Sequence, residues 1–304
     1  MSSARHIRPA GGVGVVRAAL VLLVGVLVMA WASILVRWAA APPLVIGAGR
    51  LSLATLLLAP AAVPPTVREW SGASARRLLL LGVSGMALGL HFAAWLTSLG
   101  MTSVASSVVL VSTTPLFVAV ASPMVLRERV GRPMLGAALL AMAGAILIGL
   151  ADARTAAGGL VGDLLALTGA LMAGVYVLVG RALRREVSLL AYIWPIYGLA
   201  ALMLLAACAI THQRLLGYDA QTYAMVALLA VGPQLIGHSS VNWALRYLSP
   251  AFVTVAILGE PLGATLLAFL LLAERPGWTL LAGGALLLLG IGLAVRSEQR
   301  AVPK

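Results

Sequence analysis

Long apolar runs alternate with short polar stretches along the whole chain. Each run holds about 20 mostly apolar residues, the length that an α-helix needs to cross the ~30 Å hydrocarbon core of a bilayer. The pattern therefore predicts ten membrane-spanning helices with short connections. They are expected at residues 17–38, 44–63, 77–98, 103–126, 133–151, 160–180, 189–210, 222–245, 250–273 and 277–296.

Composition strengthens this prediction. The chain has 304 residues, of which 62% are hydrophobic and 10% are charged, and its mean hydropathy is +1.04. Soluble domains carry roughly 25% charged residues. No polar stretch is long enough to fold a separate soluble catalytic or nucleotide-binding domain. The sequence thus predicts an all-α integral membrane protein whose function lies within the bilayer.

The distribution of basic residues predicts the orientation. The net charge is +12, but the basic residues form short clusters between apolar runs, so no nucleic-acid partner is expected. Ten spans place both termini on one side, and the side richer in Lys and Arg faces the cytoplasm. Four of these residues fall on the other side and Arg50 falls inside a run, whereas sixteen share the side of the termini: Arg5, Arg8, Arg17, Arg68, Arg76, Arg77, Arg127, Arg129, Arg132, Arg181, Arg184, Arg185, Arg246, Arg296, Arg300 and Lys304. Both termini are therefore predicted to be cytoplasmic.

An internal repeat appears when the chain is shifted by 146 residues. The segment "TPLFVAVASPMVLRERVG" (114–131) then aligns with "EPLGATLLAFLLLAERPG" (260–277), and Glu128-Arg129 meets Glu274-Arg275. Five spans per copy is an odd number, so the second copy must enter the membrane from the opposite side. We expect a flexible cytoplasmic tail (1–16), a first repeat (17–151), an inverted second repeat (158–296) and a cytoplasmic tail (297–304).

Two segments carry a resemblance to a known family. The stretches 92–147, beginning "FAAWLTSLGMTSVASS", and 242–278, beginning "NWALRYLSPAFVTVAILGEPLG", resemble the two EamA-type repeats of the drug/metabolite transporter superfamily. The resemblance implies a secondary transporter that exports a small metabolite across the bacterial inner (cytoplasmic) membrane by alternating access. The superfamily includes exporters of amino acids, other metabolites and drugs, and also sugar and nucleotide-sugar carriers. The substrate therefore stays open.

One acidic residue lies deep in a predicted span. Glu260 is eleven positions beyond Ser249, so at 1.5 Å per residue it lies roughly 16 Å deep, near the middle of the core. Pro261 follows and is expected to loosen the preceding turn, as Pro115 does in the first copy. Ionisable groups at this depth are costly and are functional candidates. Glu260 is expected to bind substrate or to carry a proton, or alternatively to form a permanent pair with Arg50.

Arg50 is the basic counterpart inside a span. It lies six positions past Leu44, about 9 Å below the outer edge of the core. Its guanidinium can pair with Glu260, or its planar fork can hold the carboxylate of an amino or organic acid. A third alternative is that the side chain snorkels to the outer surface.

Polar stripes on two helices supply further candidates. They are His91, Trp95 and Ser98 on the third span and Gln234, His238 and Asn242 on the eighth. Such stripes are costly against lipid, so they should face other helices or a wet cavity. His91 and His238 can relay protons, bind substrate or pack as neutral hydrogen-bonded side chains. Asn242 can join two helices or line the cytoplasmic vestibule.

Three more residues complete the predicted site. Trp31 and Tyr176 lie deep in the first and sixth spans, at nearly equivalent positions of the two repeats, where they can form pocket walls or simply pack. The Thr114 hydroxyl can meet substrate or bond back to a carbonyl of its own helix.

Small residues recur at every fourth position of the sixth span, at Gly158, Gly162, Ala166, Ala170 and Gly174. Such a flat face allows close helix contact, either inside the chain or between two copies. Internal packing is the preferred interpretation. A monomer or a homodimer is expected.

Other functional classes find less support in the sequence. No GxxxxGK[ST] motif is present, so transport would draw on a substrate or ion gradient, protons among them. An intramembrane enzyme would require paired aspartates, a Ser–His pair or a metal-ligand cluster, and a channel would require a selectivity ring. These alternatives remain behind the transporter. No metal or other cofactor is expected, and the partners are a small-molecule substrate and the lipid bilayer.

Overall fold

The computed structural model describes residues 12–102, 104–151, 159–272 and 277–301. The remaining parts of both predicted tails, Arg154 and Gly158 in the central link, and the Glu274-Arg275 pair lie outside these ranges. The described residues form helices and no strand. In the first half these are α1 (Gly12–Met29), α2 (Trp31–Trp38), α3 (Pro43–Trp70), α4 (Ala75–Ser98), α5 (Val104–Val111), α6 (Thr114–Val125) and α7 (Arg132–Ala151).

The second half contains a π-helix as well as α-helices. Its elements are α8 (Leu160–Arg184), α9 (Leu189–Ile210), α10 (Ala220–Leu229), the π-helix η1 (Ala230–His238), α11 (Ser239–Ala244), α12 (Pro250–Ile257), α13 (Gly259–Leu272) and α14 (Trp278–Ala301). Within the described ranges, eight helical segments are long and apolar enough to cross a membrane, and two shorter apolar ones occupy Val109–Val125 and Arg132–Ile148. Together they lie at the ten predicted runs.

Helix boundaries differ from the predicted ones most strongly at three places. Helix α1 begins at Gly12, inside the predicted tail, because the valines that follow continue the apolar run. Helix α14 extends to Ala301, and its residue Glu298 is buried and accepts two hydrogen bonds from Ser249. Helix α3 continues past residue 63 to Trp70, whose indole Nε1 donates a 2.8 Å hydrogen bond to the Ala191 carbonyl of α9. In the last two cases tertiary contacts, which no local pattern encodes, hold the extra turns.

The two halves share one architecture. A shift of 146 residues carries both ends of α5 onto α12, the starts of α3 and α7 onto those of α9 and α14, and the end of α2 onto that of α8. The packing follows the same relation. Helix α3 packs on α9 and α7 packs on α14, while the contact of α4 with α8 is matched by that of η1 and α11 with α1. The predicted internal repeat is therefore present in the fold.

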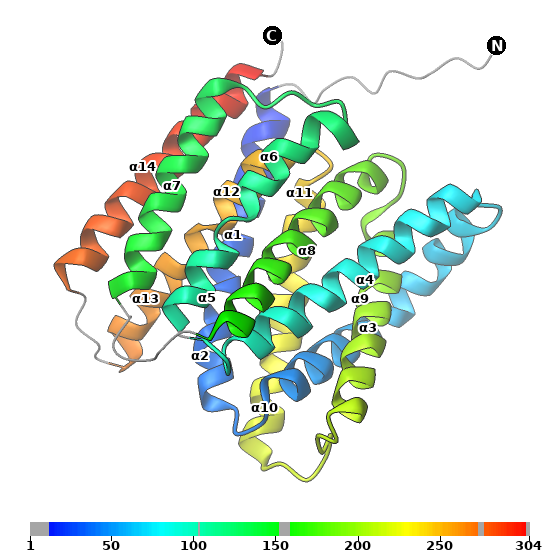
Figure 1. The fold of residues 1–304 in the computed structure, drawn as a ribbon. Coiled ribbons are helices and arrows are strands. Elements are labelled where there is room, and N and C mark those ends of the chain that lie inside the picture. Colours follow the sequence, from blue (N-terminus) through cyan, green and yellow to red (C-terminus); the bar gives the residue numbers. More distant parts are fainter. Residues whose placement is uncertain (1–11, 103, 152–158, 273–276, 302–304) are drawn as a thin grey trace, which may run out of the picture.

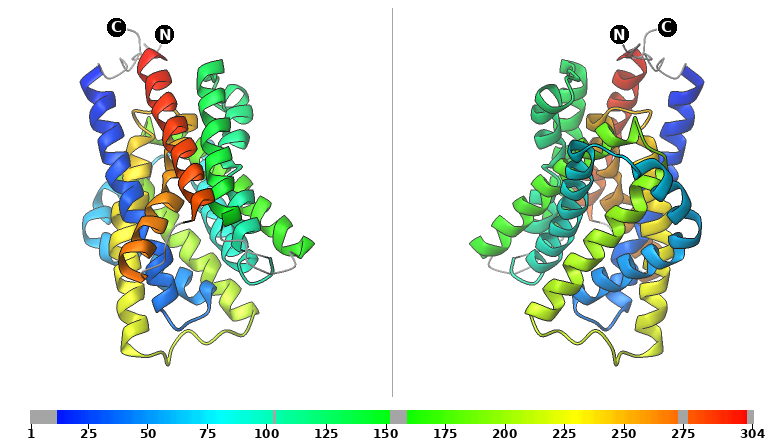
Figure 2. Two further views of the ribbon diagram at one scale, coloured as in Figure 1. Left: turned by 90° about the vertical axis from the view of Figure 1, so that its left-hand side faces the viewer. Right: turned by 90° about the vertical axis from the view of Figure 1, so that its right-hand side faces the viewer.

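The second copy runs in the opposite sense to the first. Helix α1 begins at the end of the bundle where α14 ends, whereas α8 begins at the opposite end (Figures 1 and 2). Ten passes with five in each copy require this arrangement. Which end faces the cytoplasm stays a prediction.

The breaks in the spans lie where the prolines predict them. The fourth span turns at Ser112 and Thr113, just before Pro115, and the ninth turns at Leu258, just before Pro261. A proline lacks the N–H that would bond back to the preceding turn, so the helix is weakest there. The two breaks correspond under the 146-residue shift.

Glycines allow α7 and α14 to approach each other at backbone distance. A Cβ built on Gly144 would lie 2.4 Å from the Leu287 nitrogen, and one built on Gly290 would lie 2.4 Å from the Ala141 nitrogen. Gly144 and Gly290 are equivalent positions of the two copies. Only glycine fits at either one.

The small-residue face of α8 packs inside the chain. Gly162, Ala166, Ala170 and Gly174 are buried. A Cβ on Gly162 would meet Met101 and Thr102, and one on Gly174 would contact Phe117. Internal packing, the preferred interpretation of this face, accounts for its small residues.

Candidate functional site

Polar side chains from five spans gather within the bundle. We call this group the central polar cluster; its members are Arg50 (α3), His91 (α4), Tyr197 (α9), Gln234 and His238 (η1), and Glu260 (α13). Arg50 lies close enough to Glu260, Tyr197, His91 and His238 to interact electrostatically with each of them. Four of the six positions come from the second copy and two from the first.

Arg50 is held by a neutral side chain. Its Nε and Nη2 atoms donate hydrogen bonds of 3.1 and 2.6 Å to the same oxygen, Oε1 of Gln234. The guanidinium carbon also lies 4.6 Å from the centre of the Phe92 ring, a cation–π contact. Arg50 is only 5% exposed. It therefore does not snorkel to the surface, and that alternative is wrong.

Glu260 is near Arg50 without touching it. Its electrostatic interaction with Arg50 places the two groups in the same region, but they form no ion pair, and the donors of Arg50 with hydrogen-bond geometry go to Gln234. Glu260 is the second residue of α13, directly after the break at Leu258. The permanent Arg50–Glu260 pair, one of the alternatives above, is not formed in this conformation. Neither charge has a counter-ion in contact among the residues that the structure describes.

Aromatic rings connect the two histidines. The Phe92 ring lies 5.2 Å from that of His91 and 5.6 Å from that of His238, centre to centre. His91 also stacks on Trp95 at 6.0 Å, and its Nδ1 is 2.9 Å from the Gly169 carbonyl of α8. The predicted His91–Trp95 face of α4 thus points into the bundle. Phe92, which the sequence did not single out, lies between the two histidine rings.

A second set of hydrogen bonds extends the cluster toward α8 and α11. The Tyr176 hydroxyl donates to Oδ1 of Asn242 at 2.8 Å. Asn242 Nδ2 donates to the His238 carbonyl at 2.8 Å and to the Tyr197 hydroxyl at 3.4 Å. The Tyr197 hydroxyl is 3.3 Å from Oγ of Ser239. Asn242 therefore joins helices, which is one of the two roles predicted for it. Tyr197 and Ser239 were not predicted as members of the site. A tyrosine hydroxyl within the apolar run 189–210 was a signal that could have found Tyr197.

Two predicted residues are not joined to the cluster. The Thr114 hydroxyl donates to the carbonyls of Val111 at 2.8 Å and Ala170 at 3.3 Å, so it bonds back to its own helix and to α8. Trp31 begins α2, with 39% of its surface exposed, and no described ring contact or hydrogen bond connects it to the cluster. The Thr114 hydroxyl thus bonds to a carbonyl of its own span, the second of its two predicted roles. Trp31 lines no pocket in the part of the chain that the structure describes.

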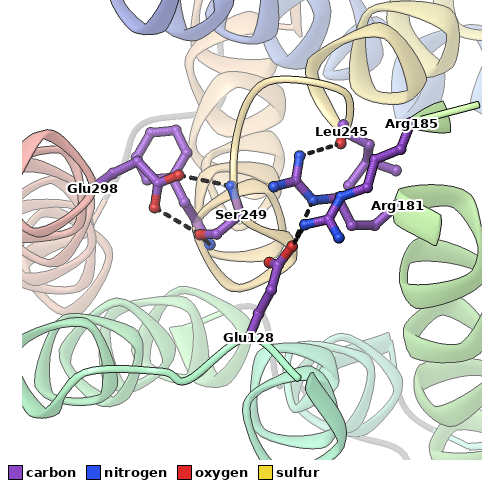
Figure 3. A network of polar contacts seen from close by, with 7 residues as sticks. Glu128, Arg181, Arg185, Leu245, Ser249 and Glu298 are labelled. Carbon is purple, nitrogen blue, oxygen red and sulfur yellow. Dashed lines mark hydrogen bonds and ion pairs between the residues drawn. The ribbon is translucent and has the colours of Figure 1, made fainter. Parts of the chain in front are cut away.

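Three charged side chains at the end of the bundle where α8 ends form ion pairs. Glu128, in the connection after α6, accepts a 3.0 Å hydrogen bond from Arg181 Nε and forms an ion pair with Arg185 (Figure 3). Arg181 also donates to the Leu245 carbonyl at 2.7 Å. The contacts of Glu128 with the two arginines tie the first copy to the second.

On the other side of the same network, Glu298 of α14 accepts hydrogen bonds from Ser249 (Figure 3). The backbone nitrogen of Ser249 donates at 2.7 Å and its hydroxyl donates at 2.6 Å. The same hydroxyl caps α12 by accepting from the Phe252 nitrogen. The charges here hold connections and helix ends in place.

Comparison with known proteins identifies relatives. The profile of the EamA-like transporter family matches residues 16–150 and again residues 160–296. Twenty-nine chains of solved structures match the fold. One of them, titled "Crystal structure of protein", superposes with a TM-score of 0.76 over 93% of this chain and 99% of that chain, at 19% sequence identity. A comparison with curated protein sequences gives no match.

Proposed function

The chain belongs to the EamA-like transporter family, and from that premise we propose that it is a secondary active transporter which exports a small acidic or zwitterionic metabolite, such as an amino acid. Transport proceeds by alternating access and is coupled to proton movement. Membership of the family accounts for a membrane transporter of small solutes. The substrate class, the direction and the coupling are proposed from the residues of the central polar cluster.

One observation carries the proposal: a buried cation and a partly buried acid lie close to each other without forming an ion pair. Arg50 belongs to the first copy and Glu260 to the second, and in the described part of the chain neither touches a counter-ion. Buried charges are normally paired, because an unpaired charge in a low-dielectric interior is costly. A site that keeps a positive and a negative side chain apart is suited to a ligand that carries charged groups of its own, which can pair with them.

Each charge then has a role in transport. The planar fork of Arg50 suits a carboxylate, which it can hold with two hydrogen bonds. Glu260 suits an ammonium group or a transported proton. The Phe92 ring contacts the guanidinium, and the rings of His91 and His238 lie beside Phe92. Together they provide an aromatic surface for the rest of the substrate. Protonation of either histidine would add to the positive charge at Arg50.

The inverted repeats supply the movement. Arg50 and Gln234 are 5% and 0% exposed, so a substrate at the cluster is shielded in this conformation. Two copies that run in opposite senses can exchange inward-open and outward-open shapes around one central site. Such a cycle needs no nucleotide. We place the termini in the cytoplasm of a bacterium, and the chain in its inner membrane, from the excess of arginines at that end.

Flux into proteoliposomes tests the proposal. Purified protein would be reconstituted and offered a radiolabelled amino-acid mixture and radiolabelled succinate, with and without an imposed pH gradient. Arg50→Gln should lower flux at least tenfold. Arg76→Gln, which removes an exposed arginine at the start of α4, should leave flux unchanged. Equal flux in both variants, or no flux of either solute in the wild type, would overturn the proposal.

A further inference from the structure

Gln234 occupies the position on Arg50 that a carboxylate would take. One amide oxygen accepts from both Nε and Nη2 of the guanidinium, the edge that also binds acids. A carboxylate offers two oxygens and a full negative charge to that edge, so it can form the bidentate ion pair that a single neutral amide oxygen cannot. The amide of Gln234 is thus a weaker partner for Arg50 than a carboxylate would be.

The amide of Gln234 is also incompletely satisfied. Gln234 is fully buried, and its Nε2 has no partner with hydrogen-bond geometry, although Tyr197 lies close by. Leaving a buried donor without a hydrogen bond is costly, because it has lost its bonds to water. A side chain whose only function was to fix the fold would be expected to use both ends of its amide. This one uses its oxygen for Arg50, while its Nε2 lies near Tyr197 without a well-formed hydrogen bond.

The backbone around Gln234 is irregular as well. Gln234 lies in the π-helix η1, next to Pro233, whereas the equivalent stretch of the first copy, 84–92, is regular α-helix within α4. π-helical turns are rare and occur often at functional sites. The departure from symmetry falls on the turn that presents the amide to Arg50.

We propose that Gln234 is a specificity-determining placeholder: its amide oxygen occupies Arg50 while the site is empty and gives way to the carboxylate of an acidic substrate. The inference rests on the proposed function, since it concerns the same site. The exchange replaces a neutral acceptor by a charged one, so an acid displaces Gln234 and a neutral solute does not. The freed amide then offers its Nε2 donors to the bound molecule.

Gln234→Glu provides the sharpest test, because it keeps the shape and adds the charge. A resident carboxylate would hold Arg50 as firmly as the substrate does. Flux of the better-transported solute, amino-acid mixture or succinate, should fall at least tenfold, while the thermal unfolding temperature stays equal or rises. Gln221→Glu is the matched control, since Gln221 is an exposed glutamine of the same span, and it should leave flux unchanged.

Gln234→Met removes the placeholder without supplying a charge. Acid then meets no competitor at Arg50, so the KM for flux should fall severalfold in the folded protein. If Gln234 only fixed the structure, Gln234→Glu would transport normally and Gln234→Met would raise KM; either result overturns the placeholder. Absence of acid flux in the wild type would instead refute the proposed function. The two failures are therefore distinguishable.

Discussion

The two copies of the repeat have nearly the same backbone and very different interiors. Under the 146-residue shift, both ends of α5 match those of α12, the starts of α3 and α7 match those of α9 and α14, and α7 and α14 cross at equivalent glycines. The polar side chains do not follow this symmetry. Every member of the central polar cluster has a residue of another kind at the equivalent position of the other copy; for example, Arg50 corresponds to Ile196, Gln234 to Leu88, and Glu260 to Thr114.

The difference teaches which part of the molecule needs symmetry. A carrier that alternates between two shapes needs two copies that can exchange conformations, and this demand falls on helix lengths, breaks and crossings. A substrate has no such symmetry, so one cation and one acid suffice. His238 and Phe92 are equivalent positions, yet their rings lie 5.6 Å apart. Equivalent residues in contact lie where the two copies meet, so the cluster sits at that junction.

The largest structural effect is expected at the symmetric glycines. Gly144→Ala and Gly290→Ala each place a Cβ 2.4 Å from a backbone nitrogen, which cannot yield as a flexible side chain can. Each variant should lose about 1–3 kcal/mol of stability, as overpacked cores do, and the two losses should be similar. Thermal unfolding in detergent would measure both.

The same helices offer controls for that comparison. A Cβ on Gly136 of α7 or Gly292 of α14 meets nothing within 4 Å. Alanine favours a helix over glycine by up to about 1 kcal/mol, so Gly136→Ala and Gly292→Ala should be neutral or stabilising. A large loss at only one of Gly144 and Gly290 would break the equivalence of the two copies.

A smaller effect is expected at the paired charges of the bundle end. Glu128→Gln removes the carboxylate between Arg181 and Arg185, which ties the first copy to α8 (Figure 3). The Glu128 and Arg181 side chains are 21% and 13% exposed, so solvent screens the pair in part, and a loss of about 1 kcal/mol is expected. The KM for flux should not change, because Glu128 lies outside the cluster.

Glu186→Gln is the control for this prediction. It breaks a 3.3 Å pair with Arg77 in which the Glu186 side chain is 60% exposed. Its effect on thermal unfolding should be near zero. A raised KM in Glu128→Gln, or equal stability in the two variants, would show that the end network has another role.

Much of the fold could be predicted from the sequence because the bilayer dictates it. Helix length follows from membrane thickness, and proline marks the breaks at Leu258 and before Thr114. The repeat shift was visible in Pro115 and Pro261. The ends of α3 and α14 were not predictable, since they depend on the contacts of Trp70 and Glu298 with distant segments.

The site was predictable in its residues more than in its contacts. Arg50, Glu260 and the histidines stand out because ionisable groups are rare in spans. Their partners depend on how helices face each other, so the choice of Gln234 over Glu260 by Arg50 could not be derived. The role of Phe92 was hidden for the same reason. An apolar residue gives no signal of a cation–π contact until the cation is placed above it.

The central claim is that the partly buried carboxyl of Glu260, at the junction of the copies, couples transport to a gradient. Flux into proteoliposomes under an imposed pH gradient, compared between the wild type and Glu260→Gln, tests it most directly. The expected result is loss of gradient-driven flux in a variant that unfolds at the wild-type temperature. Wild-type flux in that variant would contradict the claim and remove the carboxyl from the mechanism.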